Sequence, residues 1–97
     1  MDDIVYLNDL FDIYGDLLTE RQRTYFKDYY FDNLSYGEIA EKYDISRNAS
    51  FKQLKNVIDK LNELENNLGI YKKNGIIREL IKIEKDEEIK KKLEELL

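Results

Sequence analysis

The stretch LSYGEIAEKYDISR, residues 34–47, decides the fold. Ser35 lies three residues before Glu38, which is the spacing of a capping box, a pair in which each side chain caps the backbone of the other residue. Apolar residues flank this pair in the positions of a hydrophobic staple. These signals predict a short helix over about 36–43.

A turn and a second capped helix follow directly. Tyr43-Asp44-Ile45 interrupts the helical pattern, and Ser46 can cap a helix that begins at Arg47. A helix-turn-helix needs an apolar and a small residue on its first helix, so that the two helices can cross closely. The chain supplies suitable residues at suitable spacing: Ile39, Ala40, Ile45 and Ser46. The sequence therefore predicts a helix-turn-helix over about 35–55.

The helix that begins at residue 47 is predicted to be long. Its apolar residues step by three, four, three and four: Leu54, Val57, Leu61, Leu64 and Leu68. Gly69 stands where a left-handed residue that ends a helix belongs. About 22 residues at 1.5 Å each give roughly 33 Å, so this helix is expected to extend beyond the core. Its far part, Leu61, Leu64 and Leu68, forms a seam that needs a partner. We expect a homodimer along this seam; the competing arrangement folds the C-terminal tail back over it.

Two more helices are predicted upstream. Asp2 or Asp3 can cap the first, whose apolar stripe runs to Leu18. Thr19 and Gln22 form a second capping box, at which the next helix begins. That helix carries aromatic residues that we interpret as core rather than as a base-stacking platform: Tyr25, Phe26, Tyr29, Tyr30 and Phe31.

The tail is also expected to be helical. Lys72-Lys73-Asn74-Gly75 indicates a break, after which an amphipathic pattern continues among Lys and Glu residues to the end. The predicted fold is therefore all-α. It consists of a helix-turn-helix domain over residues 1–69 and a helical C-terminal extension over residues 70–97.

Composition narrows the possible functions. The 97 residues include no cysteine and no histidine, which excludes disulfides, thiolate metal sites and histidine catalysis. No constellation of the remaining residues suggests an active site or a bound cofactor, so we expect a protein that is not an enzyme. The sequence shows no apolar run of membrane-spanning length and no signal peptide, so we expect a cytoplasmic protein.

The charge is distributed unevenly. Residues 1–45 hold 11 acidic and 4 basic side chains, whereas residues 46–97 hold 10 acidic and 12 basic ones. The start of the fourth helix therefore offers the best anion-binding surface. Its candidate nucleic-acid-binding residues are Arg47, Asn48, Phe51, Lys52 and Lys55. Arginine and asparagine can contact base edges, and lysines can contact phosphates.

Two other interpretations remain open at this point. The same residues could form an ordinary solvated helix face, with Phe51 packed against a neighbouring helix. The acidic, tyrosine-rich first half or the long helix could instead dock on another protein. If the ligand is a nucleic acid, the sequence does not distinguish DNA from RNA.

The segment Leu34 to Arg47 resembles region 4 of sigma factors. A wider resemblance, to the YlxM family of small bacterial proteins, covers most of residues 4–73. The motifs that carry it are Leu10-Phe11-Asp12, Tyr14-Gly15, Leu17-Leu18-Thr19, Gln22-Arg23, Tyr29-Tyr30, Ser46-Arg47 and Leu68-Gly69-Ile70-Tyr71. This resemblance implies a regulatory helical protein that acts in the signal recognition particle pathway, with the particle's RNA, its GTPase or the receptor as possible partners.

The chain departs from the YlxM pattern in two places. Asp44 stands in the turn where the family usually has glycine. In the fourth helix, Ser50 replaces an apolar residue and Lys52 an acidic one, which makes this helix more polar and more basic than the family pattern. The departure in the fourth helix favours an anionic ligand.

Overall fold

The computed structural model describes residues 3–97, and every regular element in that range is helical. The elements, in chain order, are α1 (Ile4–Tyr14), the 3₁₀ turn η1 (Gly15–Leu17), α2 (Glu20–Tyr30), α3 (Tyr36–Tyr43), α4 (Arg47–Leu68), α5 (Ile70–Ile83) and α6 (Glu87–Glu95). The predicted all-α class and the long fourth helix are confirmed.

The helices begin where side chains cap their free backbone amides. Asp3 caps α1 by accepting from the Val5 amide at 2.9 Å, while the alternative cap, Asp2, lies outside the described residues. Thr19 with Gln22 forms a complete capping box at α2, and Ser35 with Glu38 forms another at α3. The starts of α1, α2 and α3 are therefore determined by sequence-local hydrogen bonds.

The first helix is shorter than its apolar stripe suggests. It ends at Tyr14, and η1 leads to an extended Leu18 that is nonetheless buried. The Arg23 guanidinium donates to the carbonyl oxygen of Leu18 at 2.7 Å, satisfying an acceptor that helix continuation would otherwise have used. The prediction of a helix to Leu18 is wrong because this contact from α2 stabilises a bend.

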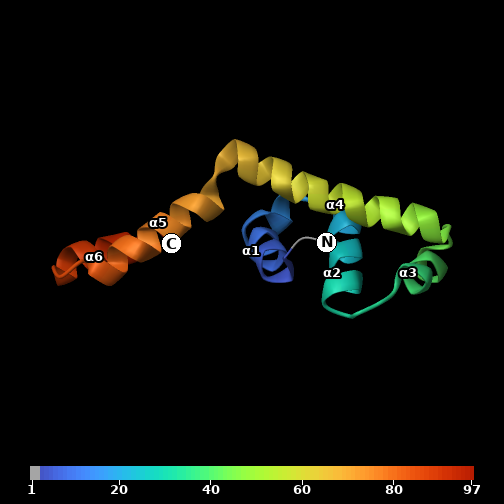
Figure 1. Cartoon of the computed structure of the whole chain (residues 1–97), viewed down its shortest axis with the longest axis horizontal. Helices are drawn as coiled ribbons and strands as arrows, with labels where there is room; N and C mark the ends of the chain where they lie inside the picture. Colours follow the sequence, from blue (N-terminus) through green and yellow to red (C-terminus); the bar gives the residue numbers. More distant parts are fainter. Residues whose placement is uncertain (1–2) are drawn as a thin grey trace.

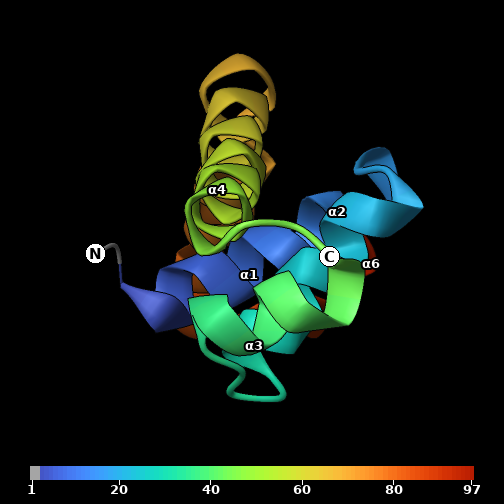
Figure 2. The ribbon, with the colours of Figure 1, turned by 90° about the vertical axis from the view of Figure 1, so that its right-hand side faces the viewer.

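The core lies where α4 crosses over α1, α2 and α3 (Figures 1 and 2). Phe11 and Phe26 stack at its centre with ring centroids 4.3 Å apart. Of the aromatic residues predicted for this helix, Tyr25 and Phe26 are buried, and Tyr29 and Tyr30 are half-buried against the core. Phe31, which follows the last residue of α2, is exposed. The interpretation of these aromatics as core thus holds for all but the last.

Ser35 provides a direct test of the start of α3. Ser35→Ala is expected to lower the free energy of unfolding by about 1 kcal/mol, because it removes the N-cap acceptor and the reciprocal contact with Glu38. The Ser35 Oγ accepts from the Glu38 amide at 3.1 Å, and the Glu38 carboxylate accepts from the Ser35 amide at 3.0 Å. Urea unfolding measures the change. A loss below a few tenths of a kcal/mol would show that this capping box does not stabilise α3.

The tail leaves the core as a helical hairpin, which we call the arm (residues 70–97). Gly69 ends α4 with φ of 64°, and α5 then runs through Gly75 without interruption. The predicted break at 72–75 is therefore wrong: a glycine inside a helix costs only about 1 kcal/mol, and there is no proline to force an interruption. The arm contributes to the elongated shape of 56 × 24 × 23 Å (Figure 1).

Candidate nucleic-acid interface

The turn between α3 and α4 is built by backbone hydrogen bonds. Asp44 adopts a left-handed conformation with φ of 55°, and the Ile45 amide donates to the Ala40 carbonyl oxygen at 2.9 Å. The Asp44 amide also donates a hydrogen bond to the Glu41 carbonyl oxygen. The two hydrogen bonds form the Schellman arrangement that ends many helices. Aspartate is one of the few residues besides glycine that adopt this conformation with some regularity. The helix-turn-helix therefore forms without the glycine of the family pattern.

Ser50 fixes α4 against α3. Its side chain is only 1 % exposed, and its hydroxyl lies 2.8 Å from the Tyr36 carbonyl oxygen and 2.7 Å from that of Arg47. The first contact connects the start of α3 to the second turn of α4. A serine can thus occupy this buried position, because its hydroxyl has acceptors inside the packed interface.

Asp28 fixes α2 against the end of α3. This carboxylate is 2 % exposed, accepts from the Tyr43 hydroxyl at 2.6 Å and pairs with Lys42 Nζ at 2.8 Å. The Arg21 guanidinium lies 4.7 Å from the centre of the Tyr43 ring, on which it can act as a cation–π partner. Burial, followed by the hydrogen bond to Asp28, raises the pKa of Tyr43. Sequence reasoning missed this cluster because its members lie 14 and 15 residues from Asp28.

The five candidate contact residues all lie exposed on the first three turns of α4: Arg47, Asn48, Phe51, Lys52 and Lys55. Asn48, Lys52 and Lys55 follow one another at helical spacings of four and three, which places them along one face. The buried residues Ser50 and Leu54 occupy a different face of the same turns. The structure thus presents the candidate side chains together on one accessible surface.

The cations on this surface differ in how freely they can meet an anion. Lys55 forms an exposed ion pair with Asp59 at 3.0 Å, one turn along the helix. Such a pair contributes roughly 0.3–0.5 kcal/mol and can be exchanged for a stronger anion. Within residues 3–97, neither Arg47 nor Lys52 has a carboxylate within ion-pair distance. These two side chains are the most available cations of the site.

Phe51 packs against a neighbouring helix and is also available for contact with a ligand, which are the two alternatives that the sequence leaves open. Its ring packs edge to face against Tyr36 at 5.4 Å, yet 44 % of the residue remains exposed. Tyr36 in turn stacks on Tyr29 with centroids 5.0 Å apart. Burial and the hydrogen bond with Tyr29 raise the pKa of Tyr36 to about 12. Phe51 is therefore held in place from behind while part of its ring faces outward beside the cations.

The predicted seam does not survive as one surface. Leu61 is fully buried in the core of the single chain, Leu64 is half-buried against that core, and Leu68 is 44 % exposed. Leu61 therefore cannot contribute to an interface with another chain. The first three helices, with Tyr14 and Phe26 among their buried residues, cover α4 further along its length than its spacing pattern suggested.

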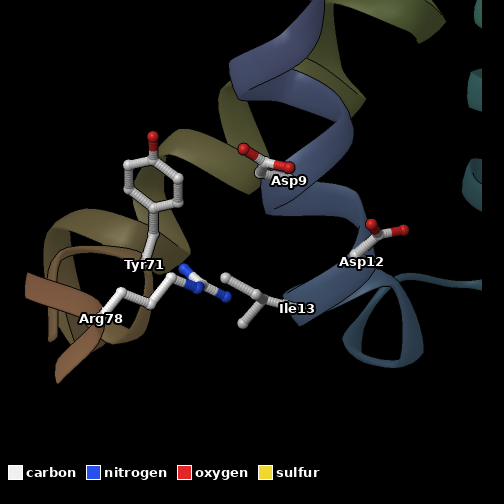
Figure 3. Close-up of a pocket in the computed structure, with 5 residues that line it drawn as sticks. All are labelled: Asp9, Asp12, Ile13, Tyr71 and Arg78. Carbon is white, nitrogen blue, oxygen red and sulfur yellow. The ribbon is translucent and has the colours of Figure 1, made fainter. Parts of the chain in front are cut away.

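A hollow of about 220 Å³ between α1 and α5 is lined by Asp9, Asp12, Ile13, Tyr71 and Arg78 (Figure 3). No group of acidic side chains within residues 3–97 is arranged to hold a metal ion. In the same range, no helix combines the length and apolar character needed to cross a membrane.

Comparisons with known proteins identify close relatives. The profile of the UPF0122 family, described as "Putative helix-turn-helix protein, YlxM / p13 like", matches residues 1–97. A UPF0122 protein of Halalkalibacterium halodurans is 41 % identical over 95 residues, covering 98 % of this chain and 79 % of the relative. One of Shouchella clausii is 42 % identical over 81 residues, covering 84 % and 74 %. One of Bacillus thuringiensis is 46 % identical over 67 residues, covering 69 % and 61 %.

Proposed function

The chain belongs to the YlxM/p13-like helix-turn-helix family, as its motifs indicated, and from this premise we propose that it is a regulatory protein that binds nucleic acid through the start of α4. One observation carries the proposal. Arg47, Asn48 and Lys52 extend together from the capped second helix of a helix-turn-helix, with their cations unpaired within residues 3–97. This is the part of such a motif that enters a groove or grips a backbone.

Each side chain of the site has a role that suits its chemistry. Arg47 and Asn48 offer the paired donors and acceptors that can recognise guanine and adenine edges. Lys52 and Lys55 offer point charges for phosphates. Phe51 offers an apolar surface for a thymine methyl group or an unstacked base. Because only a few cations oppose a formal charge of −5 for the whole chain, we expect modest affinity that weakens with salt.

The family resemblance supports a place in the signal recognition particle pathway. On this proposal, the particle's structured RNA is one candidate ligand and a DNA operator is another. A capped helix end with arginine and lysine can hold an RNA backbone without reading a major groove. We propose no catalytic role and no cofactor.

The binding surface can be tested by removing its cations. We expect Arg47→Ala, Lys52→Ala and Lys55→Ala, combined in one variant, to weaken binding to signal recognition particle RNA or to duplex DNA. The slope of log affinity against log salt should fall by about 0.9 per lost duplex phosphate contact, or about 0.7 per contact on a single strand. Mobility shift at several salt concentrations, with circular dichroism to verify folding, measures both.

A matched variant controls for net charge. Lys73→Ala, Lys82→Ala and Lys85→Ala remove the same number of charges from exposed positions of residues 70–97. This variant should keep the salt slope of the wild type. Equal effects of the two triple variants would reduce the interaction to net charge and refute the assignment to α4.

A second candidate function is a protein-interaction module that docks on the signal recognition particle GTPase or its receptor. The observation that favours it is the acidic first half, in which residues 3–45 hold 10 acidic and 4 basic side chains. Such a surface suits a basic protein partner better than a nucleic acid. Binding to the purified GTPase that persists in the triple α4 variant, without binding of any nucleic acid by the wild type, would favour this function instead.

A further inference from the structure

The arm exposes more apolar surface than a short solvated hairpin needs. Six of its aliphatic residues are between 43 % and 73 % exposed: Ile76, Leu80, Ile83, Ile89, Leu96 and Leu97. A wholly exposed aliphatic side chain offers roughly 60–120 Å², so these six together leave on the order of 300 Å² uncovered. The largest apolar patch on many whole monomers has a comparable area, and such patches are often functional.

The hairpin itself covers only one side of each helix. The two helices contact each other, and Ile77 and Ile81 on α5 and Leu93 on α6 are half-buried. Ile76, Leu80 and Ile83 recur at helical spacing along α5 and stay exposed. An isolated pair of short helices gains most of its stability from packing of apolar faces, so the uncovered row calls for a further partner.

The direction of the arm is fixed by capping bonds from the core. The Glu65 carboxylate accepts from the amides of Tyr71 at 2.9 Å and Lys72 at 3.2 Å. The Tyr14 hydroxyl accepts from the Ile70 amide at 3.1 Å and donates to Glu65 at 2.6 Å. Two side chains from α1 and α4 thus supply acceptors for the first free amides of α5. The arm cannot swing without losing these bonds.

The base of the arm is packed, whereas the rest projects. Tyr71 meets Tyr6 edge to face at 5.0 Å, and Arg78 reaches the hollow beside Ile13 (Figure 3). Beyond this point α5 and α6 leave the other helices (Figure 1). The tail therefore does not fold back over the far part of α4, which was the alternative to a dimer.

We propose that the arm is a self-association surface, on which the arm of a second copy of this chain packs to form a four-helix bundle. Two amphipathic hairpins related by a two-fold axis bury each other's exposed rows, and isologous pairing is the commonest assembly of soluble proteins. The six exposed aliphatic side chains supply on the order of 300 Å² of the roughly 800 Å² per partner of a standard interface, and the aliphatic stems of flanking lysines and glutamates add to it.

The distribution of charge favours a dimer in which the two chains meet through their arms. Residues 70–97 hold 8 basic and 7 acidic side chains, so two arms meet almost without net repulsion. Residues 3–69 hold 13 acidic and 8 basic side chains, so two cores repel each other. Pairing through the projecting arms keeps the acidic cores apart and joins the two helix-turn-helix units in one assembly.

The test replaces exposed arm residues and measures mass without any nucleic acid, so its outcome is independent of the proposed function. We expect the wild type to sediment at about twice the 11.7 kDa of one chain at roughly tens of micromolar. Leu80→Lys with Ile83→Lys should sediment as a single chain with unchanged helicity, because both residues are exposed in the folded monomer. A wild type that sediments as a single chain overturns the proposal and leaves the patch for a different partner.

A matched variant locates the interface. Val5→Lys with Leu17→Lys adds the same charges outside the arm, at two aliphatic residues that are 64 % and 59 % exposed. It should remain a dimer. A dimer that survives the arm substitutions, or one that the Val5 and Leu17 substitutions also dissociate, refutes the assignment to the arm.

Because the chain has no cysteine, Lys82→Cys on the arm and Lys27→Cys on α2 permit a cross-linking test. A short bis-maleimide should join only the first.

Discussion

Leu61→Ala is expected to destabilise the folded chain by about 2–5 kcal/mol, the range for truncating a large side chain in a packed core. Leu61 is fully buried in the hydrophobic core, and its removal leaves a cavity there. Urea unfolding monitored by circular dichroism measures the loss. Because the residue is buried within one chain, the loss should not depend on protein concentration once the assembly state is held constant.

Leu68→Ala is the matched control on the same helix. Leu68 is 44 % exposed, and truncation there should cost well under half as much as at Leu61. Equal losses would contradict the difference in burial. A Leu61→Ala variant that was as stable as the wild type but no longer formed a dimer would show that Leu61 lies in an interface between chains. That result would refute the burial of Leu61 within one chain.

This contrast shows what helical periodicity can and cannot establish. Spacing identifies which face of α4 is apolar, and Leu54, Leu61 and Leu68 do share that face. It does not establish how far along the helix the other elements reach. That depends on where α1 bends into η1 and how α2 returns, which are tertiary features. The sequence therefore placed the end of the core too early along α4, before Leu61.

The helix starts were predictable because their causes are local. Thr19, Ser35 and Ser46 each accept from an amide three residues ahead, and two of them have the reciprocal partner at the same spacing. A sequence contains all the information needed for such a pair. The turn at Asp44 was predictable for the same reason, because its hydrogen bonds join residues that lie within a few positions of one another.

The interactions that orient the helices were not predictable, because they join distant residues. The Tyr14 hydroxyl meets Glu65 across 51 positions in the sequence, and the Asp28 cluster spans 14 and 15. A single tyrosine or glutamate carries no signal of such a contact. The course of the arm depends on these contacts, so its helicity was predictable and its direction was not.

The candidate interface shows the same division. The positions of Arg47, Asn48 and Lys52 on an exposed helix start followed from the cap at Ser46 and the apolar spacing. The support of Phe51 by Tyr36 could not be read from the sequence, because Tyr36 belongs to another helix. A pattern thus locates the surface, while the structure shows how its side chains are held.

Stability is expected to fall steeply as the pH rises from about 10 to about 12, because tyrosines that are buried or half-buried resist ionisation. Burial is the largest cause that raises the pKa of Tyr14, Tyr36 and Tyr43, and that of Tyr36 rises from 10.0 to about 12. A group with a raised pKa binds its proton more tightly when folded. Its contribution to stability is therefore complete below the unfolded pKa and is lost as the pH rises toward the folded value.

The magnitude for Tyr36 follows from the size of its shift. One pKa unit corresponds to about 1.36 kcal/mol, so Tyr36 alone accounts for a loss on the order of 2–3 kcal/mol across this range. Urea unfolding at a series of pH values measures the slope. Tyr36→Phe keeps an aromatic ring against Phe51 and Tyr29 but removes the ionisable hydroxyl, so its stability should decline less steeply above pH 10 than that of the wild type. Parallel curves for the two proteins would show that Tyr36 ionises as readily in the folded chain as in the unfolded one, which its burial beside Tyr29 and Phe51 contradicts.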